Sequence, residues 1–124
     1  MKLEQMSDDI YLLLEAYERL NSRIVSLTRC VILSLLAYFV DGIQFRELKE
    51  ALKMSDGKLI SNLNELRTMG YIVKSEAEVD RRKVDVYSLT EKGRIELSKV
   101  VEWMKLVQKV ASGGDDKCQM ILAR

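Results

Sequence analysis

Residues 55–72 read SDGKLISNLNELRTMGYI, and this stretch decides the fold. Ser55 followed by Asp56 indicates a helix start, because a hydroxyl caps free N–H groups and a carboxylate favours the positive end of the helix dipole. Leucines then recur at three- and four-residue steps, and Gly70 is the residue type that commonly follows a helix C-terminus. The stretch predicts an amphipathic helix over residues 56–69. Its buried face carries Leu59, Leu63 and Leu66.

The sequence on either side of this helix predicts two further elements. FRELKEALKM, residues 45–54, has the spacing of a short amphipathic helix, so the two helices form a helix-turn-helix. After Gly70 the spacing of apolar residues changes from the 3.6-residue period of a helix to the two-residue period of a strand. YIVKSEAEV and VDVYSLT, residues 71–79 and 84–90, then read as two strands, with DRRK at the tip of the hairpin between them.

Longer helices are expected outside this unit. Ser7 with Asp8 and Asp9 begins one, with a break near Asn21. Residues 27–40 are apolar nearly all round, which is typical of a helix at the centre of a domain. Thr90 caps a long final helix. The predicted fold class is therefore mainly α with a β-hairpin (α+β).

Composition excludes several classes of function. The 124 residues contain no histidine, which removes the commonest general base and metal ligand, so we expect neither an enzyme nor a cofactor or metal site. Cys30 and Cys118 match no metal or redox spacing, and a reducing cytoplasmic location is expected. The apolar run CVILSLLAYFV is too short to span a bilayer. The net charge of +1 excludes a strongly basic nucleic-acid binder but allows a local cationic patch.

Three segments between residues 29 and 94 resemble the winged helix-turn-helix transcriptional regulators of the MarR-like and related archaeal and bacterial kind. They are RCVILSLL, SDGKLISNLNELRTMGYI and VYSLTEKGR, the last following the hairpin. The resemblance implies that helix 56–69 lies in the DNA major groove and that the hairpin, 71–89, is a wing on the minor groove or backbone. It divides the chain into an N-terminal dimerisation helix (1–28), a winged helix-turn-helix core (29–90), a C-terminal dimerisation helix (91–111) and a flexible tail (112–124).

The polar side chains of the predicted recognition helix suit base contacts. Lys58, Ser61, Asn62 and Glu65 lie off the leucine face. An Asn side chain can pair with adenine through two hydrogen bonds, and a Lys side chain can reach guanine acceptors or a phosphate. A Ser hydroxyl can bond to either of these. Glu65 has three interpretations: an acceptor from a cytosine amino group, a like-charge penalty near phosphate, or an ion-pair partner. Predicted backbone contacts are Arg81, Arg82 and Lys83 at the wing, with Arg46 and Lys92 as lesser candidates.

The outer helices carry more apolar surface than one winged domain covers, which predicts a homodimer and hence a palindromic double-stranded DNA site. The rival interpretation is a protein–protein interaction module without DNA binding, favoured by the near-neutral charge and by acidic residues beside the wing. The sequence leaves any small-molecule effector unknown.

Overall fold

The computed structural model describes residues 7–23 and 26–113 of the chain. The chain divides into two units. One unit is Ser22–Leu97, and the other combines residues up to Asn21 with those from Ser98 onward. The mainly α, α+β fold expected from the sequence is confirmed.

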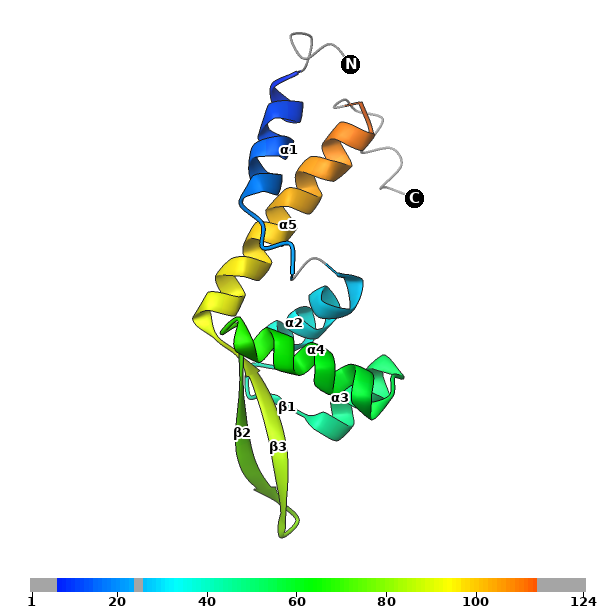
Figure 1. Ribbon diagram of the computed structural model, residues 1–124, viewed down its shortest axis with the longest axis vertical. Helices are drawn as coiled ribbons and strands as arrows, with labels where there is room; N and C mark the ends of the chain where they lie inside the picture. Colours follow the sequence, from blue (N-terminus) through cyan, green and yellow to red (C-terminus); the bar gives the residue numbers. More distant parts are fainter. Residues whose placement is uncertain (1–6, 24–25, 114–124) are drawn as a thin grey trace. The chain divides into compact units, whose positions relative to one another are not determined.

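The unit Ser22–Leu97 is a winged helix-turn-helix (Figure 1). Its helices are α2 (Leu27–Tyr38), α3 (Phe45–Leu52) and α4 (Asp56–Thr68), and it includes the first turns of α5 (Glu91–Ala111). Its strands are β1 (Ile43–Gln44), β2 (Ile72–Val79) and β3 (Arg82–Leu89). They form one antiparallel sheet in the order β1–β3–β2, from which β2 and β3 project as the wing.

Buried aliphatic side chains hold this unit together. Leu59, Leu63 and Leu66 of α4 have no exposed surface, as the leucine spacing predicts. Burying one such side chain contributes about 1.5–3 kcal/mol, whereas an exposed ion pair contributes about 0–1 kcal/mol. The packing of apolar side chains therefore fixes the arrangement of the helices. The other buried members of this core are Ile32, Leu33, Leu36, Ile43, Leu48, Met69, Tyr71, Ile72 and Tyr87.

A joint of backbone and hydroxyl groups connects α4, the wing and α5. Gly70 adopts φ +79° after α4, so the predicted helix-ending glycine is confirmed. The Thr90 hydroxyl donates to the Gly70 carbonyl (2.7 Å) and accepts from the Gly93 N–H (3.0 Å). The Thr90 N–H donates to the Tyr71 carbonyl oxygen at 3.0 Å. The predicted Thr90 cap is thus present, and its hydroxyl also bonds to the chain that leaves α4.

The structure corrects three expectations. Residues 27–40 are not buried all round, because Leu27 and Tyr38 are 84% and 80% exposed. The short strand β1 has no signal in the sequence, since two residues cannot show an alternating pattern. The wing tip is only Asp80 and Arg81, both with positive φ as in a type I′ turn, while Arg82 already belongs to β3.

The other unit contains α1 (Asp8–Glu18) and the part of α5 from Ser98. Helix α1 begins at Asp8, so the predicted helix start is confirmed, but the Ser7 side chain makes no capping hydrogen bond. An ion pair of 3.1 Å joins Lys109 Nζ to Asp9 Oδ1. None of the α1 residues is buried, and Leu14 and Tyr17 are exposed.

Among residues 7–23 and 26–113, no helix is both long enough and apolar enough to cross a membrane. Cys30 is a free thiol of intermediate burial. Cys118 and the end of the predicted tail lie outside the described residues.

Gly93 is expected to tolerate no side chain. A β-carbon there would lie 2.1 Å from the Tyr71 carbonyl oxygen and 2.8 Å from Leu89 Cδ1. Gly93→Ala should therefore lower the free energy of unfolding by about 1–3 kcal/mol, the usual cost of overpacking. Gly57→Ala is the control, because no atom lies within 4 Å of its β-carbon position, and alanine favours a helix over glycine. Urea unfolding that finds Gly93→Ala as stable as Gly57→Ala would contradict this packing.

Cys30 is expected to be a slow nucleophile. Burial raises the pKa of its thiol, and a hydrogen bond with the Ser26 backbone offsets this only in part. A raised pKa leaves less thiolate at mildly alkaline pH. In a Cys118→Ser variant, iodoacetamide should alkylate native Cys30 more slowly than the same thiol in urea at equal pH, as mass spectrometry can follow. Equal or faster alkylation of the native protein would indicate a reactive thiol instead.

Candidate nucleic-acid interface

The four predicted base-contacting side chains of α4 have two different environments. Lys58 and Ser61 are exposed. Asn62 and Glu65 are partly buried, on the flank of α4 that meets the start of α2. The structure therefore places all four off the leucine face, but only two of them point freely to solvent.

Asn62 is engaged at both ends of its amide. Arg29 Nε–H donates to Asn62 Oδ1 at 3.1 Å, and Asn62 Nδ2 donates to the Lys58 carbonyl at 2.9 Å. A bidentate contact with adenine needs that same oxygen and nitrogen. These bonds use one of the two hydrogen-bonding positions at each end of the amide and orient it toward Arg29, so Asn62 has less capacity left for a base than an unbonded amide.

Glu65 is an ion-pair partner, which was one of its three interpretations from the sequence. Arg23 Nη2 binds Glu65 Oε2, and Arg29 Nη1 donates to the carbonyl of Arg23. The two arginines thus form a connected set of bonds from the start of α2 to the flank of α4. This set holds the Glu65 carboxylate away from the solvent-facing stripe of the helix.

The residues opposite the leucines form an exposed stripe along α4. Of the four predicted base contacts, only Ser61 belongs to this stripe. Gly57, Ser61, Asn64 and Thr68 follow one another at steps of four, three and four, and all are exposed. Asn64 is the residue that sequence reasoning missed. The signal was available, because this stripe has the same spacing as the leucine stripe and lies on the other side of the helix. Ile60, beside the stripe, is 45% exposed.

The cations of the wing lie on different sides of the hairpin. Arg82 pairs with Val79 and Lys83 with Glu78, and neighbouring residues of a strand point to opposite faces. Lys83 therefore shares its face with Glu78. Arg82 shares the other face with valines. Arg81 occupies the exposed turn between the strands.

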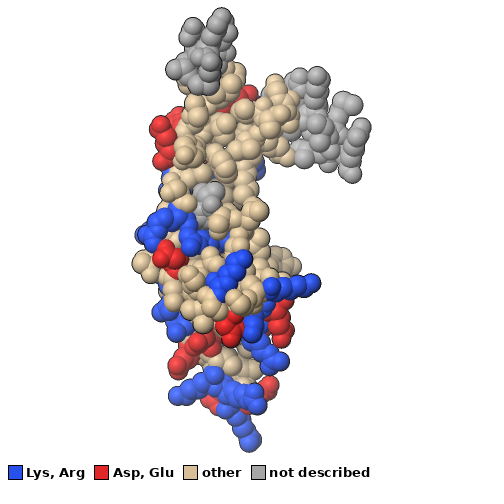
Figure 2. Space-filling model, turned by 45° about the vertical axis from the view of Figure 1, so that its right-hand side comes forward, with Lys and Arg blue, Asp and Glu red and all other residues tan. Residues whose placement is uncertain are grey.

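Acidic residues also lie on the Lys83 face. Glu76 pairs directly with Asp85, and two like charges opposite each other destabilise a strand pair. Figure 2 shows the result: Lys and Arg side chains gather at the end of the wing, with Asp and Glu among them. The cationic character of the wing is local to its tip and to one of its faces.

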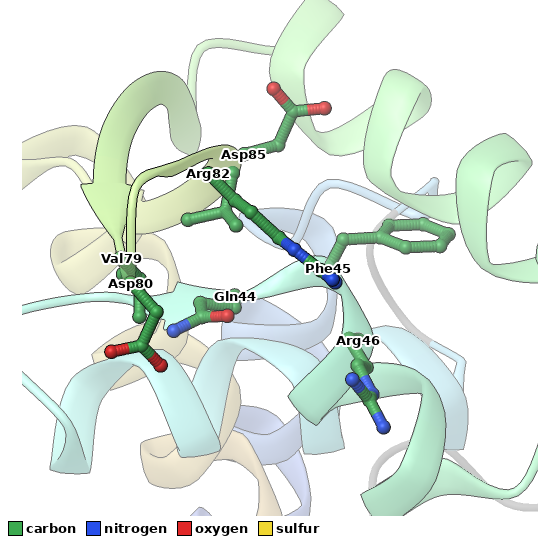
Figure 3. A pocket seen from close by; sticks show the side chains of 8 residues that line it. Gln44, Phe45, Arg46, Val79, Asp80, Arg82 and Asp85 are labelled. Atoms are coloured by element: carbon green, nitrogen blue, oxygen red, sulfur yellow. The ribbon is translucent and has the colours of Figure 1, made fainter.

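Lys92 and Arg46, the two lesser candidates for backbone contacts, differ in the interactions that their side chains already make. Lys92 Nζ lies 5.6 Å from the centre of the Tyr71 ring, a cation–π arrangement. Arg46 Nε contacts Glu50 Oε1 at 3.3 Å, and the Arg46 side chain is 81% exposed. Arg46 and Arg82 line one pocket between the start of α3 and the wing (Figure 3). The described part of the chain contains no group of three or more His, Cys, Asp or Glu side chains that could hold a metal ion.

Comparison with known structures supports the fold. YusO from Bacillus subtilis is 20% identical, with a TM-score of 0.68 over 99% of this chain and 92% of that one. A MarR-family transcriptional regulator from Rhodococcus is 18% identical, with a TM-score of 0.59 over 97% and 91%. A MepR mutant from S. aureus, bound to an oligodeoxyribonucleotide, is 13% identical, with a TM-score of 0.63 over 92% and 87%.

At these identities the likeness is one of fold, and it is the fold of MarR-family regulators. No curated protein sequence matches the chain. A family model described as a winged helix DNA-binding domain matches residues 28–107, which is more than half of the chain. The chain therefore belongs to the winged helix DNA-binding domain family.

Proposed function

We propose that this protein is a homodimeric, sequence-specific transcriptional regulator that binds double-stranded DNA, with helix 56–69 in the major groove and wing 71–89 on the minor groove or backbone. The observation that carries the proposal is the exposed polar stripe of α4, opposite its buried leucines. A helix that lies in the major groove needs such a face of side chains able to donate and accept hydrogen bonds.

Lys58 and Ser61 are the proposed direct base contacts, and Asn64 joins them because it lies on the same exposed stripe as Ser61. Asn62 and Glu65 rank below them, because Arg29 and Arg23 already bind these two side chains. This ranking follows from hydrogen-bonding capacity, since an amide or carboxylate bonded within the protein offers less to a base.

The cations of the wing supply the proposed backbone contacts. Arg81 lies at the exposed turn, and Arg82 and Lys83 follow on opposite faces of β3. Arg46 and Lys92 remain proposed phosphate contacts. Lys92 is the weaker of the two, because its ammonium already lies over the Tyr71 ring.

A second copy of the chain is the proposed partner of α1 and α5. The exposed side chains Leu12, Leu14 and Tyr17 of α1 and Val101 and Met104 of α5 are large and apolar. Exposed apolar side chains on two helices of one unit support an interaction site there, because soluble proteins rarely leave large apolar patches uncovered. A two-fold dimer places two recognition helices about 34 Å apart, one turn of DNA, which implies a palindromic site.

DNA binding is tested by selecting sequences from random duplexes and measuring affinity by fluorescence anisotropy over a range of salt concentrations. Replacing both Arg81 and Arg82 by Gln should weaken binding. It should also reduce the slope of log K against log [salt] by up to about 2, because each phosphate contact contributes roughly 0.9. Lys105→Gln, an exposed position on α5, is the control and should leave the slope unchanged. Unaltered binding by the double variant would remove the wing from the interface.

The alternative, a protein–protein interaction module, is favoured by one observation. The wing places Glu76 opposite Asp85, an arrangement that repels phosphate as well as being unfavourable for the hairpin. Failure of the wild-type protein to retain any duplex at low salt would support this alternative.

Dimerisation is tested by sedimentation. The wild-type chain should sediment as a dimer at micromolar concentration, and Leu14→Glu should sediment as a monomer, because a charge on a buried apolar interface is not compensated. Val79→Glu, an exposed apolar position on the wing, is the control and should stay dimeric. Circular dichroism checks that both variants keep their helices. A wild-type monomer would overturn the proposal.

A further inference from the structure

We infer that Arg46 and Arg82 together hold a single phosphate of the DNA backbone, in the pocket between the start of α3 and the wing. This inference rests on the DNA binding proposed above and names the group that this part of the interface recognises. The pocket has a volume of about 590 Å³, and both arginines line it, with Gln44, Val79 and Val84 among its other residues.

The sheet explains why two arginines from distant parts of the sequence share this pocket. Strand β1 pairs with β3 only at Tyr87 and Val86. Among the described residues, no strand pairs with the outer part of β3, from Arg82 to Asp85, on that side. The chain passes directly from Gln44 of β1 into α3, so Arg46 in the first turn of α3 lies beside this open part of β3.

The alternation along β3 then aims Arg82 at the pocket. Arg82 pairs with Val79, and Lys83 points to the opposite face, where it pairs with Glu78. Figure 3 shows the Arg82 side chain extending across the pocket toward Arg46. Arg46 and Arg82 reach the pocket from different elements, the start of α3 and the start of β3, and both line it.

The acidic residues nearby do not neutralise this pair of cations. Asp80 and Asp85 line the same pocket, but in Figure 3 their carboxylates point away from the two guanidinium groups. Glu50 contacts Arg46, but that pair is exposed on both sides, and such pairs contribute about 0–1 kcal/mol. The structure gives Arg82 no ion pair within the described residues. An anion in the pocket would be attracted by the positive charges of both arginines.

The chemistry favours a phosphate. A guanidinium presents parallel N–H groups that match two phosphate oxygens, and two guanidinium groups together occupy the oxygens of one phosphodiester. The pocket is open and lies between the helix-turn-helix and the wing, the two parts proposed to contact the duplex. A backbone phosphate that reaches it would therefore be held from both sides.

The test is a double-mutant cycle on DNA binding. Arg46→Gln, Arg82→Gln and the double variant are compared with wild type on the selected duplex over a range of salt concentrations. If the arginines share one phosphate, the double variant should lose only about 0.9 from the log–log salt slope, because one phosphate contact is lost. Its loss of affinity should also be smaller than the product of the two single losses. The pair Arg46→Gln and Arg81→Gln is the matched control and should lose affinity multiplicatively.

Three outcomes overturn the inference. A slope loss of about 1.8, with multiplicative loss of affinity, would assign the arginines to separate phosphates. An unchanged slope would remove both arginines from the backbone. Inorganic phosphate alone, at millimolar concentration, should not produce a saturable shift of the Arg46 and Arg82 Nε–H resonances. Saturation without DNA would assign the pocket to free phosphate.

The inference and the proposed function fail in different ways. If wild type binds no duplex, the proposed function fails and the inference fails with it. If wild type binds and the cycle is multiplicative, only the shared phosphate is wrong. Circular dichroism of each variant establishes that it is folded, and the exposure of the Arg46 side chain makes a folding defect unexpected.

Discussion

Hydrogen bonds of Thr90 connect the proposed recognition helix with the wing. The Thr90 hydroxyl donates to the carbonyl of Gly70, just after the recognition helix α4, and accepts from the N–H of Gly93, in the first turn of α5. The Thr90 N–H also donates to the Tyr71 carbonyl at the start of β2. Both ends of the wing are therefore bonded to the end of the recognition helix. A groove-binding helix and a backbone-binding loop can act on one duplex only if their separation is fixed, and these bonds fix it.

Much of this joint could be predicted from the sequence, because its residues are specified locally. A glycine after an amphipathic helix and a threonine before a glutamate-containing turn act within a few residues of themselves. The need for glycine at position 93 is harder to predict from local sequence, because it arises from contact with the carbonyl of Tyr71, a residue distant in the chain. The turn packs so closely there that no space for a β-carbon remains.

The parts that could not be predicted depend on long-range pairing. Arg29 binds Asn62, 33 positions away, and Arg23 binds Glu65, 42 positions away. No local sequence pattern indicates either contact. The face on which each wing cation lies depends on hairpin register. That register is set by a turn of two residues, so Arg82 and Lys83 separate instead of gathering at the tip. Asn64 was different, because its stripe was readable from helical spacing.

The separation of charges over the two faces of the wing bears on how a chain of net charge +1 binds a polyanion. Summed over the sequence, cations and carboxylates nearly cancel. The two-residue period of β3 instead places Arg82 with valines and leaves Lys83 with Glu78, while Glu76 and Asp85 lie on that same acidic face. Charges on opposite faces act on different neighbours, and salt screens the more distant ones. A weak overall attraction gives little affinity for arbitrary DNA, so discrimination must come from contacts made at short range. The polar stripe of α4 is where such contacts are available.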